Sequence, residues 1–137
     1  MQNIVPMLAY ENGIVALEWL VKAFGFKENV EMRMMENNRL THAELKLGES
    51  IIMLATPSPD YESINNHRKH CKQTDKWLQV PYIVNGLLVY VENVDAHYKK
   101  SNENGAEILS EIEDGFPGKR YRCADPEGHR WMFMQKN

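Results

Sequence analysis

The stretch Ala23-Phe24-Gly25-Phe26 follows a run of apolar residues at helical spacing, and Asn104-Gly105-Ala106 follows a second helical run, with its glycine 80 positions after Gly25. Glycine tolerates the left-handed backbone that commonly ends a helix, so each stretch predicts a helix end. A second glycine pair, Gly48 and Gly128, repeats the offset of 80 positions in two predicted turns. Two pairs at one offset indicate that the chain is built from one unit used twice.

Both halves show the same order of predicted elements: strand, helix, strand, strand, strand. Short apolar runs and stretches of alternating apolar residues predict the strands, including one strand over residues 26–35. We therefore predict an α+β fold of two tandem βαβββ modules that form an incompletely closed mixed sheet around a cleft. The predicted divisions are a first module over residues 1–56, a connection over 57–84 with a helix over Ile64–Leu78, and a second module over 85–137.

The composition argues against several classes of function. The 137 residues carry a net charge of −3 and only one short basic stretch, His67–Lys72, so we predict no nucleic-acid partner. The apolar runs are far shorter than the ~20 residues of a membrane helix, and no secretory signal is visible. Cys71 and Cys123 are too few for a disulfide framework and favour reduced thiols. We therefore expect a cytoplasmic protein that has no membrane partner.

Four motifs, in this order, resemble those of the vicinal oxygen chelate superfamily, which includes glyoxalase I, bleomycin-resistance proteins and extradiol dioxygenases. They are Ala23-Phe24-Gly25-Phe26, Asn93-Val94-Asp95-Ala96, Asn104-Gly105-Ala106 and Asp125-Pro126-Glu127-Gly128-His129. The chain is most similar to an uncharacterised glyoxalase-like branch. The resemblance implies the doubled βαβββ fold, a small-molecule ligand in the cleft and a homodimer, since halves from two chains often complete the cleft.

The resemblance also implies where a metal would be held, because metal-dependent members place His and Glu ligands at four inward-facing strand positions. Here the corresponding strands are nearly empty of such donors: residues 1–10, 50–59 and 85–91 contain no Asp, Glu, His or Cys. In the last strand the family's Glu corresponds to Met132, whose thioether is a poor ligand for a hard cation. We therefore predict no metal and no other cofactor.

His42 and Glu44 are the strongest candidates for catalytic residues. They lie two positions apart in a predicted strand, so their side chains share one face. If that face lines the cleft, they form a general acid/base pair or two metal ligands. A buried hydrogen-bonded pair, or a half-exposed strand face that Lys46 continues, explains the same pattern without any chemistry.

Five residues are candidates for binding a ligand: Met7, Met53, Arg122, Arg130 and Met132. Methionines can form an adaptable apolar pocket, and arginines on one strand face can hold an anion. In the last strand, the alternation predicts that Trp131 and Phe133 lie in the core, while Arg130 and Met132 line the cleft. Core packing and solvated arginines explain the same residues without a ligand.

His67, His70 and Cys71 have the i, i+3, i+4 spacing that would place them on one side of the helix predicted over Ile64–Leu78. Such a set suits a soft metal such as zinc. The surrounding cations and the lack of a fourth ligand favour a polar surface helix instead.

These observations leave two functions open. The first is a protein that binds a small apolar or aromatic molecule without a metal, as bleomycin-resistance proteins sequester a drug. The second is a lyase, isomerase or dioxygenase that uses His42 and Glu44, with or without a divalent metal. The missing metal donors and the apolar strands favour the first.

Overall fold

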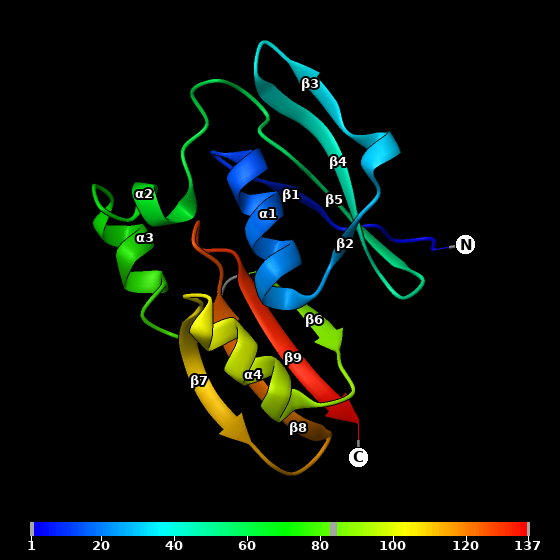
Figure 1. The fold of residues 1–137 in the computed structure, drawn as a ribbon. Coiled ribbons are helices and arrows are strands. Elements are labelled where there is room, and N and C mark those ends of the chain that lie inside the picture. Colours follow the sequence, from blue (N-terminus) through cyan, green and yellow to red (C-terminus); the bar gives the residue numbers. More distant parts are fainter. Residues whose placement is uncertain (1, 83–84, 137) are drawn as a thin grey trace. The chain divides into compact units, whose positions relative to one another are not determined.

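Figure 1 shows the fold in a computed structural model, which describes residues 2–82 and 85–136. The chain divides into two units, Met1–Ser63 and Ile64–Asn137. The strand order is β1-β5-β4-β2 in the first unit, where β3 also pairs with β4, and β6-β9-β8-β7 in the second. Over the described residues neither sheet closes into a barrel. The predicted α+β fold with two βαβββ modules is confirmed.

The first unit is built on a mixed sheet. Its strands are β1 (Met7–Ala9), β2 (Lys27–Glu28), β3 (Met34–Glu36), β4 (Arg39–Leu47) and β5 (Ser50–Ala55). β1 runs parallel to β5, and β4 is antiparallel to β5, β2 and β3. The tight turn between β4 and β5 contains Gly48 at φ +58°, a conformation that favours glycine.

Helix α1 (Gly13–Phe24) covers one face of this sheet (Figure 1). The side chain of Asn12 caps its start by accepting a hydrogen bond from a backbone amide of the first turn. Gly25 ends it at φ +81°, as the sequence predicted. The residues of β4 that face the helix, Ala43 and Leu45, are fully buried. The side chains between them therefore point to the face opposite α1.

The structure differs from the prediction of one strand over residues 26–35. β2 stops after Glu28, a 3₁₀ turn η1 (Val30–Met32) follows, and pairing resumes only at β3. Local i→i+3 hydrogen bonds lift the chain out of the sheet, and a bidentate ion pair of Arg33 with Glu28 at 2.7 Å closes the turn. The apolar alternation here misled the prediction because Val30 and the methionines that follow it are exposed rather than buried.

The second unit repeats the arrangement with β6 (Gly86–Tyr90), β7 (Glu107–Glu113), β8 (Gly118–Ala124) and β9 (Arg130–Lys136). β6 runs parallel to β9, while β8 is antiparallel to both β9 and β7. Helix α4 (Val94–Glu103) covers one face (Figure 1), and Asn93 caps it by accepting a hydrogen bond from a first-turn amide at 3.0 Å.

Aromatic side chains form the core between α4 and this sheet. Trp131, Phe133 and Tyr121 are almost completely buried, and the His97 ring of α4 packs against Phe133 in a tilted arrangement, 3.9 Å between centroids. This arrangement confirms the prediction that Trp131 and Phe133 belong to the core. Arg130 and Met132 alternate with them in β9, so their side chains leave the sheet on the face opposite α4.

Asp125 organises the turn that joins β8 to β9. Its Oδ1 accepts three backbone hydrogen bonds, from Glu127, Gly128 and His129, each at 3.1 Å. Its Oδ2 accepts a fourth from Nε1 of buried Trp131, also at 3.1 Å. The carboxylate itself is buried, so this one side chain links the turn to the aromatic core.

The connection between the modules does not form the single helix predicted over Ile64–Leu78. It contains two short helices, α2 (Ile64–His67) and α3 (Lys72–Trp77), because the backbone of Cys71 is extended. Arg68 donates to Asp75 at 2.9 Å and ties the two pieces together. The last two residues of the predicted connection, 83 and 84, lie outside the described residues.

Candidate functional site

A hollow of about 270 Å³ lies on the face of the second sheet opposite α4. It brings together three of the five predicted ligand-binding residues. Its floor is a row of side chains that face one another across three strands, Leu88 of β6, Met132 of β9 and Arg122 of β8. The residues that line it are Pro81, Tyr82, Gly86, Leu87, Leu88, Arg122, Arg130, Trp131 and Met132.

Arg130 fixes one wall of this hollow. It is buried, and its guanidinium donates to the backbone carbonyl oxygens of Leu78, at 2.6 Å, and of Val80. Burial lowers the pKa of Arg130 from its ordinary value, since desolvation disfavours the charged form. Because the segment around Val80 is held to β9 in this way, Tyr82 is brought to the rim of the hollow.

Tyr82 and Arg122 meet at the rim. The guanidinium carbon of Arg122 lies over the Tyr82 ring, 5.9 Å from its centroid. The Tyr82 side chain is otherwise largely exposed. An exposed aromatic face beside an apolar floor and a cation can bind a planar molecule.

The remaining candidates lie together on the first sheet, on the face opposite α1. Met7, Met53 and Glu44 face one another across β1, β5 and β4. Nε2 of His42 lies 3.4 Å from Oε2 of Glu44, and the Glu44 backbone carbonyl accepts from Asn29 at 2.9 Å. The prediction that His42 and Glu44 share a strand face is confirmed. Met7 is largely exposed.

Each row is considered separately for the donors that a divalent metal needs. In the first row Glu44 carries such a donor, and His42 lies beside it. The second row consists of two apolar side chains, Leu88 and Met132, and the cation Arg122, none of which is a ligand for a hard cation. That the protein holds no metal stays a prediction from the sequence.

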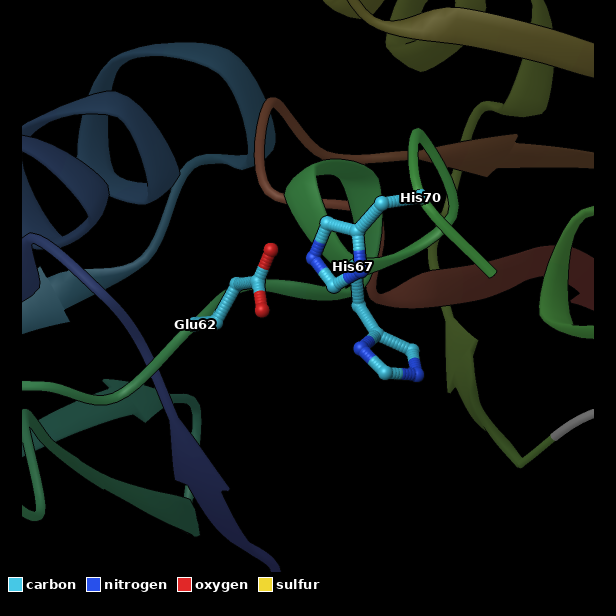
Figure 2. A group of neighbouring side chains, drawn as sticks. All are labelled: Glu62, His67 and His70. Atoms are coloured by element: carbon cyan, nitrogen blue, oxygen red, sulfur yellow. The ribbon is translucent and has the colours of Figure 1, made fainter.

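His67 and His70 remain close in space even though α2 ends at His67 and His70 lies in the turn that follows. Their rings meet edge to face with centroids 5.2 Å apart (Figure 2). Both are exposed, and Glu62, which Figure 2 also draws, belongs to the other unit. The prediction that one helix holds His67, His70 and Cys71 on one side is therefore wrong.

The two cysteines differ sharply in environment. The Thr74 hydroxyl donates to Sγ of Cys71 at 3.3 Å, and this hydrogen bond is the main reason that the pKa of Cys71 falls to about 7. Cys123 is fully buried in β8, and desolvation raises the pKa of its thiol.

We expect iodoacetamide to alkylate Cys71 with a half-maximal rate near pH 7, because the thiolate is the nucleophile, while Cys123 stays unmodified in the folded protein. Thr74→Val should move that midpoint to higher pH, and Thr74→Ser, which keeps the hydroxyl, should leave it in place. Mass spectrometry after timed alkylation measures both sites. Equal modification of Cys123 in the folded protein would contradict the assignment.

Tyr82 and Leu88 were not among the candidates drawn from the sequence. Tyr82 lies in the connection, where no periodicity marks it, and the hydrogen bonds of Arg130 hold the neighbouring segment at the hollow. Leu88 faces Met132 across the parallel pair β6 and β9. The apolar run of β6 indicated a strand but not which of its side chains would be exposed.

Comparison with known proteins assigns the fold to a family. A model of the Glyoxalase/Bleomycin resistance protein/Dioxygenase superfamily matches residues 9–133, and the chain belongs to this superfamily, as its motifs predicted. Among curated proteins, the uncharacterized protein Mb0911c of Mycobacterium bovis is 27% identical in an alignment that covers 95% of this chain and 80% of that protein.

Two solved structures extend the comparison. TioX from Micromonospora sp. ML1 is 28% identical, with a TM-score of 0.71 and full coverage of both chains. TnmS3, an antibiotic binding protein from Streptomyces sp. CB03234, is 15% identical, with a TM-score of 0.63 and full coverage of both chains. At that identity TnmS3 shows the shared fold alone. In the described part of this chain, no helix has the length and apolar character needed to cross a membrane.

Proposed function

We propose that this protein binds a small apolar or aromatic molecule in the hollow of its second unit, without a metal. The observation that carries the proposal is the hollow itself, in which the apolar floor of Leu88 and Met132 lies beside the exposed ring of Tyr82. Its volume of about 270 Å³ is at the small end for ligand pockets, which suits one or two fused rings.

The relatives support the same proposal. The superfamily includes bleomycin-resistance proteins, and TnmS3 is an antibiotic binding protein with the same fold. Sequestration needs a shaped apolar surface and no reactive group, which is what the row of Leu88 and Met132 offers. A cytoplasmic location is part of the proposal, and it agrees with the two free cysteines.

The proposal predicts that Leu88→Glu lowers the affinity for planar aromatic compounds at least about tenfold, because a carboxylate placed in the apolar floor must be desolvated when the ligand binds. Leu88 is 46% exposed, so the unbound protein tolerates the change. Titration of the protein with a panel of one- and two-ring aromatic compounds, followed by calorimetry, measures the loss.

Val15→Glu is the matched control, since Val15 is an apolar residue of α1 with 57% exposure and lies outside the hollow. It should bind the panel as the unmodified protein does. Failure of the unmodified protein to bind any compound of the panel would overturn the proposal.

A second candidate function rests on the His42–Glu44 pair. The imidazole and carboxylate lie 3.4 Å apart, with His42 half-buried and Glu44 buried, a geometry that general acid/base catalysis can use. Under this alternative the protein is a lyase, isomerase or dioxygenase. Elemental analysis of protein purified without added metal separates the two, since one tightly held Ni, Zn, Fe or Mn per chain would favour the enzyme.

We also propose that the chain forms a homodimer, as the family resemblance implies. Tyr90 lies on the edge strand β6, outside the residues that line the hollow, and it is 51% exposed. A second copy can contact this exposed ring. Sedimentation that shows only monomer at micromolar concentration would argue against it.

A further inference from the structure

Arg122 differs from the other arginines of the chain in what it contacts. Four of the six arginines pair with a carboxylate: Arg33 with Glu28, Arg39 with Glu36, Arg68 with Asp75 and Arg120 with Glu113. The fifth, Arg130, donates to two backbone carbonyls. Within the described residues no carboxylate pairs with Arg122, and its one hydrogen bond goes to Oγ of Ser110 at 3.5 Å.

The position of Arg122 indicates why the missing carboxylate partner matters for ligand binding. It lies in the row with Leu88 and Met132 and lines the hollow, so its guanidinium is at the edge of the apolar floor. Charged side chains that line a pocket without an opposite charge are expected to meet that charge on the ligand. The net charge of the chain is −3, so only local cations can attract an anion here.

The contact with Tyr82 leaves Arg122 free to bind such a charge. The guanidinium carbon lies 5.9 Å from the Tyr82 ring centroid, and within the described residues the side chain donates only from Nη1, to Ser110. Nε and Nη2, which form one edge of the planar guanidinium, have no acceptor there. A carboxylate can therefore accept two parallel hydrogen bonds from the same group. Arg130 cannot take this role, since its two terminal nitrogens already donate to carbonyl oxygens.

We infer that the hollow selects planar aromatic molecules that carry a carboxylate, with Arg122 binding the carboxylate and Leu88, Met132 and Tyr82 contacting the rings. The inference rests on the proposed function and narrows its ligand from apolar aromatic compounds in general to aromatic acids. Arg122 is thus the residue that sets specificity, and the apolar floor supplies contact area.

The test compares two probes of one shape, 2-naphthoate and 2-naphthamide, by calorimetry at pH 7. The unmodified protein should bind the acid at least about tenfold more tightly than the amide, since hydrogen bonds to a charged group are stronger than neutral ones. Added salt should weaken binding of the acid and leave binding of the amide unchanged.

Arg122→Gln should remove the preference and leave the two probes within about twofold of each other, while Arg122→Lys should keep a reduced preference. Arg120→Gln is the matched control: Arg120 is two residues away in β8, on the same face, and already pairs with Glu113 at 3.1 Å. It should keep the full preference. Circular dichroism establishes that each variant is folded.

Equal affinity of the unmodified protein for the acid and the amide would overturn the inference and leave the proposed function intact. Absence of binding by either probe, together with failure of the wider aromatic panel, would overturn both. Retention of the full acid preference by folded Arg122→Gln would overturn the assignment to Arg122.

Discussion

Arg130→Met should open the segment that carries Tyr82 and reduce the affinity for aromatic probes about tenfold. The variant removes both donors that hold the carbonyl oxygens of Leu78 and Val80, and methionine can offer no replacement. The effect should be local, because replacing a buried charge by an apolar side chain of similar length also removes its desolvation cost. Trypsin cleavage after Lys76 should accelerate about tenfold, and so should hydrogen exchange of the backbone amides of residues 78–80 and 82.

The controls separate this effect from the loss of a positive charge. Arg120→Met removes a charge from the same sheet face, but it breaks an ion pair with the half-exposed Glu113 and a hydrogen bond to the Gly118 carbonyl within β8. Neither contact holds the connection, so cleavage and affinity should stay unchanged. Arg130→Lys can reach one carbonyl rather than two and should fall between the two variants. Unchanged cleavage and unchanged affinity in Arg130→Met would contradict the role assigned to Arg130.

Asp125→Ala should produce the largest loss of stability, about 3 to 5 kcal/mol in the free energy of unfolding. It removes the acceptor of three backbone amides and of the Trp131 indole N–H, and that indole is buried where water cannot replace the lost partner. Urea unfolding monitored by tryptophan fluorescence measures the change.

Asp125→Asn provides a graded comparison. Its amide oxygen can still accept from the turn, while its NH₂ group would face the indole N–H of Trp131, a second donor. We expect it to lose about half as much stability as Asp125→Ala. Asp114→Ala, at an exposed position of the preceding loop, should be neutral. A loss below about 1 kcal/mol for Asp125→Ala would show that the turn is held by other means.

The elements that the sequence predicted best are those where periodicity and burial coincide. α1 and α4 begin at Asn12 and Asn93 because each offers a capping oxygen, and Gly25 ends the first helix in the left-handed conformation. In β9 the alternation of large aromatic residues with Arg130 and Met132 assigned both faces correctly, because only one face is covered by a helix.

The predictions of secondary structure failed where the side chains that formed the sequence pattern are not buried. Val30 and the methionines around it alternate as a strand would, yet they are exposed and the backbone forms a 3₁₀ turn. The stretch from Ile64 to Leu78 lacks glycine and proline, but it is too polar for one face of a helix to be buried, and it breaks at Cys71. Helix propensity without tertiary packing does not determine such a segment.

The site was predictable only in part. Arg122, Arg130 and Met132 were correctly placed on one face, since strand alternation is enough for that. The role of Arg130 as a link to the connection could not be foreseen, because its partners are backbone carbonyls about 50 positions away, which no side-chain pattern marks. The position of Tyr82 at the hollow depends on the same hydrogen bonds of Arg130, so it could not be foreseen either. Ligand binding by the five candidate residues stays a prediction.

The attachment of Tyr82 has a consequence for how this protein can evolve. Arg130 donates to backbone carbonyl oxygens of the connection, and every amino acid carries such a carbonyl. Tyr82 itself projects into solvent, with 67% of its surface exposed. Substitutions of Tyr82 can therefore accumulate without weakening the hydrogen bonds of Arg130 or the aromatic core. The rim of the hollow is therefore free to change its side chains while the sheet beneath it stays constant.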